Sequence, residues 1–356
     1  MILSFYTVVA GWTVSYVFEE IFYFAGMTDW ATWIGDTSNG WLNAFFSIAF
    51  MSATVSIITG GVSDGIERAT KTLMPMLFVI LVALIGYVAM QPGSSEGLSI
   101  YLNPDFTMVT PTLIFDAMGQ AFFSLSLGMG ALITYGSYLS KKENIPQAAA
   151  LVTTTDTIVA FLAGLLIIPA MYLAQAQGIS IFDGSGELIA GPALIFQVLP
   201  SLFHELGGAW GLILGVTFFL LLSVAALTST ISLLEVPVSY AIDEFQIKRK
   251  DAAKYIGLGI LAIALVISFQ TSLIGYLDTI FSQIGLPLGG ILICLFLSYE
   301  WKVENAFKEL DTGNPGFSQS MVGKVWKLMV MVICPIVIFW NLAQPYVYDY
   351  ILPLFN

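Results

Sequence analysis

Charged side chains are scarce in this sequence. Only 10% of its 356 residues are charged and 57% are hydrophobic, whereas a soluble domain carries about 25% charged residues. The mean hydropathy is +0.86. The net charge of −12 also excludes the basic surface that nucleic acid requires. This composition predicts an all-α polytopic membrane protein surrounded by a lipid bilayer.

Histidine and cysteine are nearly absent as well. The two cysteines, Cys294 and Cys334, lie in apolar runs, where we expect small packing residues rather than a disulfide. The single histidine, His204, is either an ordinary residue at the membrane interface or a proton relay. The sequence contains no nucleophile–base constellation and no phosphate-binding glycine loop, so it does not predict an enzyme.

Lysine and arginine are missing from every second connection between the apolar runs. All twelve lie in alternate connections, and such residues favour the cytoplasmic side. We therefore expect a multi-pass protein of the cell inner (plasma) membrane, with a cytoplasmic N-terminus and an extracytoplasmic C-terminus. The apolar runs predict nine spans, each near the ~20 residues that cross a bilayer, at about 2–18, 41–59, 72–90, 113–138, 147–174, 209–240, 255–273, 279–299 and 326–344.

The chain is organised around the apolar stretch 116–140, which is long enough to span the membrane. Its middle contains Ser124, Ser126, Gly128 and Gly130. Each glycine costs about 1 kcal/mol in a helix interior, and serine competes for backbone hydrogen bonds. The stretch is either a broken helix whose backbone and hydroxyls face a buried ligand site, or an intact helix whose small residues let a neighbour approach closely.

An acidic residue, Asp156, lies within another span, in the sequence TTTDTIVAFLAG. An ionisable side chain inside a membrane is costly and indicates a functional site by default. The middle of no span contains a basic residue that could pair with it, so a cation is its natural partner. The alternative is a protonated Asp156 that is hydrogen-bonded to the neighbouring threonines.

Four segments carry motifs of one known family. They read GQAFFSLSLGMGALITYGSY (119–138), GVSDGIERATKTLMPMLF (61–78), ALTSTISLLE (226–235) and YTVVAGWTVSYVF (6–18). The first resembles the sixth helix of the neurotransmitter:sodium symporter family, in its bacterial amino-acid branch. The second resembles that family's second inner loop and fifth helix. The third and the fourth resemble its eighth and third helices.

This resemblance covers essentially the whole chain and implies a single transmembrane transporter domain over residues 1–356. The implied architecture is the LeuT-type fold of two inverted five-helix repeats. The nine spans correspond to family helices 3–11, so the sequence lacks the first two helices of the family and is N-terminally truncated relative to it.

The resemblance also implies two sodium sites. At the first site Ser124 would bind the ion, together with Asp156, which falls at or one residue from the family's position. At the second, Ala225, Thr228 and Ser229 lie on one helix face and would supply a carbonyl and two hydroxyls. Without the resemblance, that face would be read as a packing face of small residues. Both sites would be incomplete without the family's first helix. Chloride is not expected, because the Asp156 carboxylate would replace the anion of animal relatives.

A substrate pocket and two gates follow from the same resemblance. Tyr6 would bond the carboxylate of an amino acid, Phe123 would close over it, and Met129 favours a broad pocket for a hydrophobic or aromatic side chain. The implied pocket lining is Ile2, Tyr6, Phe123, Ser124, Ser126, Met129, Ser229 and Leu233. The implied gate residues are Gln120, Phe123 and Asp278 on the outside and Tyr138 and Asp243 on the inside.

Together these features predict sodium-coupled symport of a hydrophobic or aromatic amino acid by alternating access. The resemblance also allows a homodimer. The alternative is a truncated, non-transporting membrane protein, either an inactive fragment or a regulatory or assembly partner, because half of each ion site would be missing.

Overall fold

The structure is a computed structural model that describes residues 1–182, 184, 186, 188–189 and 191–346. The described chain is mostly helical, and one isolated antiparallel bridge pairs Phe182 with Leu188. The predicted outer position of residue 356 falls outside the described residues.

Eight helical stretches among these residues are long and apolar enough to cross a membrane. They match eight of the nine predicted spans. The remaining predicted span, 113–138, is interrupted in its middle. The eight stretches are Ile2–Phe24, Gly40–Thr59, Val62–Ala89, Ile145–Ala176, Gly208–Phe245, Arg249–Phe269, Leu273–Glu300 and Met321–Ala343.

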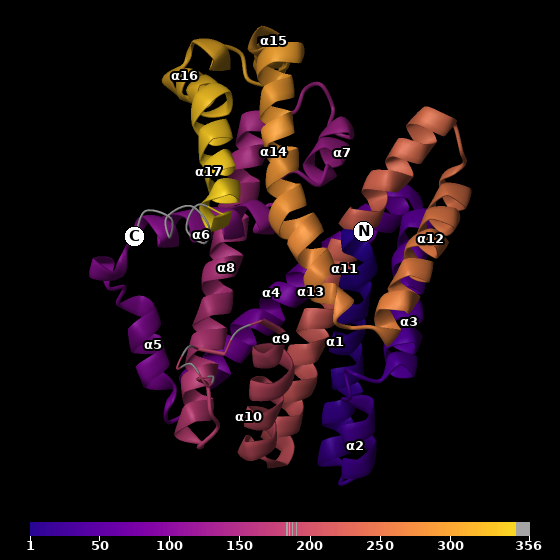
Figure 1. Cartoon of the computed structure of the whole chain (residues 1–356), viewed down its shortest axis with the longest axis vertical. Helices are drawn as coiled ribbons and strands as arrows, with labels where there is room; N and C mark the ends of the chain where they lie inside the picture. Colours follow the sequence, from indigo (N-terminus) through magenta and orange to yellow (C-terminus); the bar gives the residue numbers. More distant parts are fainter. Residues whose placement is uncertain (183, 185, 187, 190, 347–356) are drawn as a thin grey trace. The chain divides into compact units, whose positions relative to one another are not determined.

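The chain divides into two compact units, and each is described by itself. Unit 1 comprises Met1, Leu3–Asp105 and Ile158–Ile274, and unit 2 comprises Ile2, Phe106–Thr157 and Gly275–Asn356. Two of the boundaries fall within helices that Figure 1 labels, α8 (Ile145–Ala176) and α13 (Leu273–Asp278), and another lies between Asp105 and Phe106.

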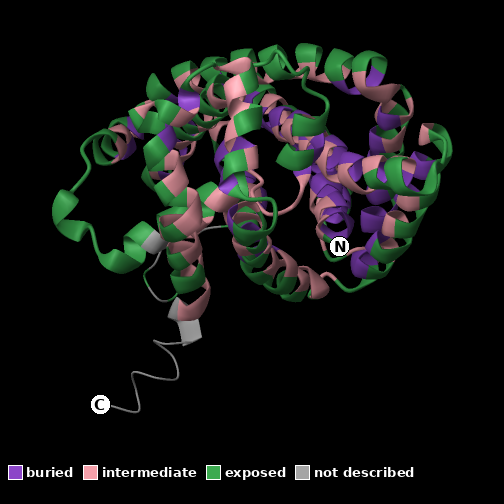
Figure 2. Ribbon diagram, turned by 90° about the horizontal axis from the view of Figure 1, so that it is seen from above, coloured by how far each residue is buried: buried purple, intermediate pink, exposed green. Residues whose placement is uncertain are grey.

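Unit 1 holds most of the buried side chains, and Figure 2 shows them gathered around the N-terminal helix. Besides its part of α8, its elements are α1 (Ile2–Phe24), α2 (Thr28–Ile34), α3 (Gly40–Thr59), η1 (Val62–Glu67), α4 (Arg68–Ala89), α5 (Ser94–Leu102), α9 (Gly191–Ala193), η3 (Leu194–Val198), α10 (Leu199–Leu206), α11 (Gly208–Phe245) and α12 (Arg249–Phe269).

Buried polar side chains tie the long helices of unit 1 together. The indole of Trp12 in α1 donates to Asn43 Oδ1 in α3 at 2.8 Å, and the Asn43 amide donates to the carbonyl of Ser268 in α12 at 3.2 Å. The hydroxyls of Thr54 and Thr230 join α3 to α11 at 2.8 Å. Because a buried polar group without a partner is costly, these bonds fix how the helices face one another.

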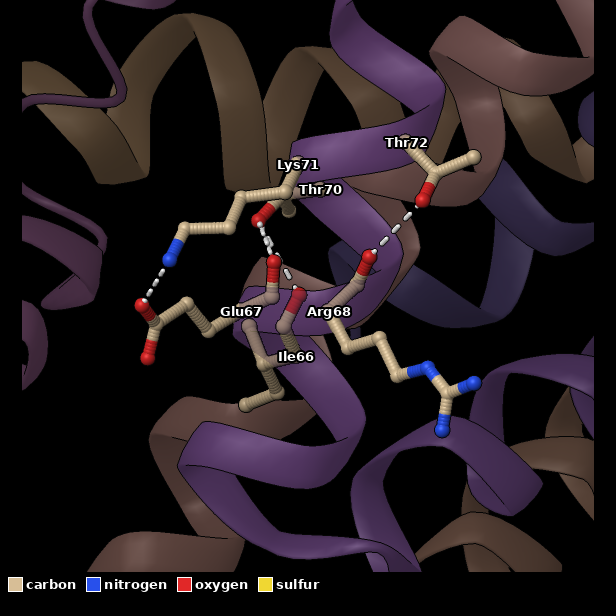
Figure 3. A network of polar contacts seen from close by, with 6 residues as sticks. All are labelled: Ile66, Glu67, Arg68, Thr70, Lys71 and Thr72. Atoms are coloured by element: carbon tan, nitrogen blue, oxygen red, sulfur yellow. Dashed lines mark hydrogen bonds and ion pairs between the residues drawn. The ribbon is translucent and has the colours of Figure 1, made fainter.

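The basic end of α4 satisfies its polar groups locally (Figure 3). Lys71 pairs with Glu67 at 2.6 Å, and the Thr70 hydroxyl donates to the Glu67 carbonyl at 3.1 Å. The Thr72 hydroxyl donates to the Arg68 carbonyl at 3.2 Å. These groups lie just before the apolar run of the helix, as the charge pattern predicts.

Unit 2 is less buried, since only 11% of the span window in Met321–Ala343 is buried, and its apolar side chains suit contact with lipid. Helix α14 packs against α17 and α6, and both cysteines are half-buried and free, as predicted. Besides its part of α8, the unit contains η2 (Phe106–Met108), α6 (Pro111–Ser124), α7 (Ala131–Ser137), α13 (Leu273–Asp278), η4 (Thr279–Ile284), α14 (Gly285–Leu295), η5 (Phe296–Glu300), α15 (Val303–Gly313), η6 (Phe317–Gln319), α16 (Met321–Leu328), η7 (Met329–Ile333) and α17 (Cys334–Tyr346).

Candidate functional site

The stretch 116–140 is a broken helix and not an intact one, whereas the ligand site beside the break stays a prediction. Helix α6 ends at Ser124 and α7 begins at Ala131. Between them, Ser126, Gly128 and Gly130 have positive φ angles of 55°, 82° and 87°. This conformation is strained for serine and natural for glycine, so the sequence itself forces the helix to end here.

Helix α14 packs directly on this break. A Cβ atom added to Gly128 would overlap the carbonyl oxygen of Leu286, and one added to Gly290 would overlap the ring of Phe122. Two glycines therefore allow the irregular backbone to lie against a neighbouring helix of the same unit. Non-helical backbone is tolerated within a membrane when protein covers it in this way.

Ser124 and Asp156 meet at the end of α6. The Ser124 hydroxyl donates to Asp156 Oδ1 at 2.8 Å. Two neighbouring threonines do not donate to Asp156, because the hydroxyls of Thr153 and Thr157 donate to carbonyls of their own helix, α8. The structure thus places a hydroxyl and a carboxylate, two hard oxygen donors of the kind that sodium favours, beside the break.

The three predicted outer-gate residues share one cavity of about 440 Å³ in unit 2. The Gln283 side chain donates to Asp278 Oδ2 at 3.2 Å. The cavity also has polar lining residues that sequence reasoning missed, although each is a polar residue within or beside an apolar run. Its lining is Asp116, Gly119, Gln120, Phe122, Phe123, Asp278, Ser282, Gln283, Leu286, Pro287 and Asn341.

A second group of predicted residues meets in unit 1. The hydroxyls of Thr228 and Ser229 donate to the Ala225 carbonyl at 2.8 and 3.3 Å, and the Tyr6 hydroxyl is hydrogen-bonded to Ser229. Leu233 lies one turn further along α11 and is half-buried. Hydroxyls that donate in this way keep their lone pairs, so this carbonyl and these hydroxyls could also face a cation.

The remaining predicted residues occupy less constrained places. Ile2 opens α1, while Ser126 and Met129 lie in the break and are half-buried. Tyr138 follows α7 in unit 2, whereas Asp243 lies near the end of α11 in unit 1. The pairing of these last two at an inner gate stays a prediction.

Sequence reasoning missed a buried cluster in unit 1. Glu19 and Glu20, near the end of α1, lie beside His204 in α10, with His204 Nε2 3.5 Å from an oxygen of each carboxylate. In the sequence, only the adjacent acids and the single histidine indicate this cluster. The acids and the histidine are far apart in the sequence, so their proximity could not be predicted. The site of His204 is therefore more than an isolated position at the membrane interface.

Several membrane-spanning helices, together with a span that breaks beside an intramembrane carboxylate, define a polytopic secondary transporter. The sequence matches the sodium:neurotransmitter symporter family over residues 21–353, and the chain belongs to that family. It is therefore a sodium-dependent, multi-pass membrane transporter and not an enzyme, which confirms the class inferred from the sequence.

The chain is similar to transporters from distant organisms. It is 32% identical to an uncharacterized sodium-dependent transporter of Haemophilus influenzae, with 95% of this chain and 74% of the relative covered. It is 31% identical to the uncharacterized sodium-dependent transporter YhdH of Bacillus subtilis, with 96% and 77% covered.

A solved structure confirms the fold. The crystal structure of MhsT in complex with L-phenylalanine is 40% identical to this chain, with a TM-score of 0.78. The match covers 95% of this chain and 77% of MhsT. The LeuT-type fold predicted from the sequence motifs is therefore correct.

Proposed function

We propose that the protein couples the inward movement of sodium to the uptake of a hydrophobic or aromatic amino acid. The observation that carries this proposal is the 2.8 Å hydrogen bond between Ser124 and Asp156 at the broken helix. It supplies a charged oxygen site where a membrane would otherwise exclude cations. The similarity to MhsT, solved with L-phenylalanine, supports the substrate class.

The first sodium ion would bind Ser124 and Asp156. A carboxylate inside a membrane is stabilised by a bound cation and destabilised without one, so ion binding and closure of the site would favour each other. Because Asp156 supplies the fixed negative charge, we expect transport without chloride. The second ion would bind the Ala225 carbonyl and the hydroxyls of Thr228 and Ser229.

The substrate would contact both sides of the predicted pocket. The Tyr6 hydroxyl would donate a hydrogen bond to the substrate carboxylate. The thioether of Met129 is flexible and polarizable, so it suits aromatic as well as aliphatic side chains. Ile2, Ser126, Ser229 and Leu233 complete the proposed lining.

The gates would then alternate. Gln120, Phe123 and Asp278 would close the outer side over the substrate, and Tyr138 and Asp243 would open the inner side. In this scheme the protein lies in the cell inner membrane with its N-terminus in the cytoplasm. A homodimer is consistent with the proposal but is not required for it.

The test is a thermal-shift screen of the purified full chain against the twenty amino acids, in sodium buffer and in potassium buffer. We expect an increase in melting temperature with phenylalanine and other large apolar amino acids, in sodium only. Uptake of radiolabelled ligand by proteoliposomes, driven by a sodium gradient, then tests transport. Absence of binding by all twenty amino acids in sodium would refute the proposed substrate class.

A further inference from the structure

The cluster of Glu19, Glu20 and His204 contains no residue assigned to transport. Helix α1 supplies the two acids, and α10, which packs on α11 (Figure 1), supplies the imidazole. The side chain of Glu20 is 0% exposed, that of Glu19 10% and that of His204 19%. One ligand atom from each of the three lies within 4.8 Å of the other two.

Packing holds these groups in place. The Tyr23 ring stacks on the His204 imidazole, with 3.5 Å between the ring centroids and an angle of 7° between the planes. The Phe24 ring lies edge-on to the imidazole. Gly215 in α11 leaves the space that the Glu20 carboxylate fills, because any Cβ there would overlap the carboxylate. The cluster is therefore a built site and not a chance meeting of surface residues.

The polar atoms of the cluster face one another without hydrogen bonds. In the described part of the chain, both Glu20 oxygens, Glu19 Oε2 and His204 Nε2 are buried and have no hydrogen-bond partner. A charge-assisted bond between imidazolium and carboxylate would shorten to about 2.7–2.9 Å, yet both nitrogen–oxygen distances are 3.5 Å. A tetrahedral ion with bonds of about 2.1 Å holds its ligand atoms roughly 3.4 Å apart.

The charge of the site also favours a cation. Two carboxylates in a buried position are costly unless positive charge balances them. His204 Nε2 is the nitrogen that faces these two carboxylates. Segments 19–40 and 175–208 contain no lysine or arginine, so no other cationic side chain of these segments can neutralise the pair.

We propose that Glu19, Glu20 and His204 bind a divalent transition-metal ion, with Zn²⁺ as the type ion, which links α1 to α10. Two carboxylates and one imidazole form a typical donor set for such an ion, and water would complete the coordination. Calcium and magnesium take oxygen ligands and higher coordination numbers, so they fit this site poorly.

The first experiment uses the unaltered full chain, purified without a histidine tag. Because the printed sequence contains one histidine, modification by diethyl pyrocarbonate, detected by mass spectrometry, reports on His204 directly. We expect micromolar Zn²⁺ to protect His204 and to raise the melting temperature, and millimolar Mg²⁺ or Ca²⁺ to do neither. An unchanged melting temperature in saturating Zn²⁺ would overturn the proposal.

The second experiment measures Zn²⁺ affinity by calorimetry in matched variants. Glu20→Gln and His204→Gln each remove a ligand, and we expect each to weaken binding at least ~10-fold. Glu205→Gln changes an exposed neighbouring acid and should bind as the unaltered chain does. Size-exclusion chromatography checks that each variant is folded. Equal Zn²⁺ affinity in all of these proteins would place the ion elsewhere and refute the site.

Discussion

At the residue scale, the proposed first sodium site depends on two oxygens from segments far apart in the sequence. The Ser124 hydroxyl donates a hydrogen bond to Asp156 Oδ1 at 2.8 Å and so keeps lone pairs that can face an ion. The carboxylate contributes the charge, and the serine fixes its orientation. Loss of the charge should therefore affect the ion more strongly than loss of the hydroxyl.

Asp156→Asn keeps the size of the side chain and removes its charge. We expect the sodium concentration at half-saturation to rise at least ~10-fold, which corresponds to about 1.4 kcal/mol of binding energy. Sodium titration of the thermal shift measures it. Asp64→Asn, at an exposed position on η1, should leave the titration unchanged, and a variant at Asp156 that behaves like this control would contradict the proposed ligand.

Gly128→Ala tests the break itself. The substitution places a Cβ at φ 82° and against the Leu286 carbonyl, so we expect a loss of about 1–3 kcal/mol of stability. Melting in detergent, followed by tryptophan fluorescence, measures it. Gly136→Ala is the control, because it lies in α7 with open space around it. Equal melting temperatures for the two variants would mean that α14 does not restrict the break.

Sequence reasoning finds residues whose chemistry is unusual for their position. Ser124 and Asp156 stand out because hydroxyls and a carboxylate are costly in apolar spans, and the structure brings these two together. Glu20 does not stand out in the same way, because an acid near the end of a span is common. Its role depends on Gly215 and His204, which only the packing of three helices brings to it.

At the scale of elements, an ion pair joins Glu235, in the last third of α11, to Arg249, the first residue of α12. Arg249 Nη1 lies 2.8 Å from Glu235 Oε2, and the Glu235 side chain is 0% exposed. A buried pair contributes little net stability compared with apolar residues, but removing one member leaves a buried charge uncompensated. The pair therefore specifies how the two helices meet.

Arg249→Met should cost about 3–5 kcal/mol and lower the melting temperature by several degrees, because Glu235 is left buried and charged. The double variant Glu235→Met with Arg249→Met should recover most of that loss. Lys250→Met, at the exposed next position, is the control. A double variant no more stable than Arg249→Met would show that the uncompensated charge is not the cause.

The long helices could be predicted because apolar runs of spanning length leave few alternatives in a bilayer. Short elements in the connections, such as α2 and α5, could not. They are too short to cross and too mixed in composition for a clear period, so their helical state depends on the surfaces on which they lie. The end of α6 at Ser124 could be approached only as one of two interpretations.

At the scale of the whole molecule, the segregation of basic residues predicts the orientation of the transporter across the membrane. The two ends of α8 offer a direct test, because Lys142 precedes it and Gln177 follows it, and both are exposed. Cys294 and Cys334 are first replaced by alanine.

In intact cells, a membrane-impermeant maleimide should label Gln177→Cys and not Lys142→Cys. Permeabilised cells should show labelling of both, which controls for reactivity. The opposite pattern in intact cells would reverse the proposed orientation, and with it the direction in which the gates are assigned.

The broken span has a consequence for how the protein enters its membrane. Helix α6 has 14 residues and α7 has 7, so at 1.5 Å per residue they reach about 21 Å and 10 Å, and neither crosses a hydrocarbon layer of ~30 Å alone. The irregular turn between them is shielded by Leu286 and the rest of α14, which the ribosome makes much later. The break is therefore covered only after α14 has been made, and we expect the insertion of these two spans to be coupled.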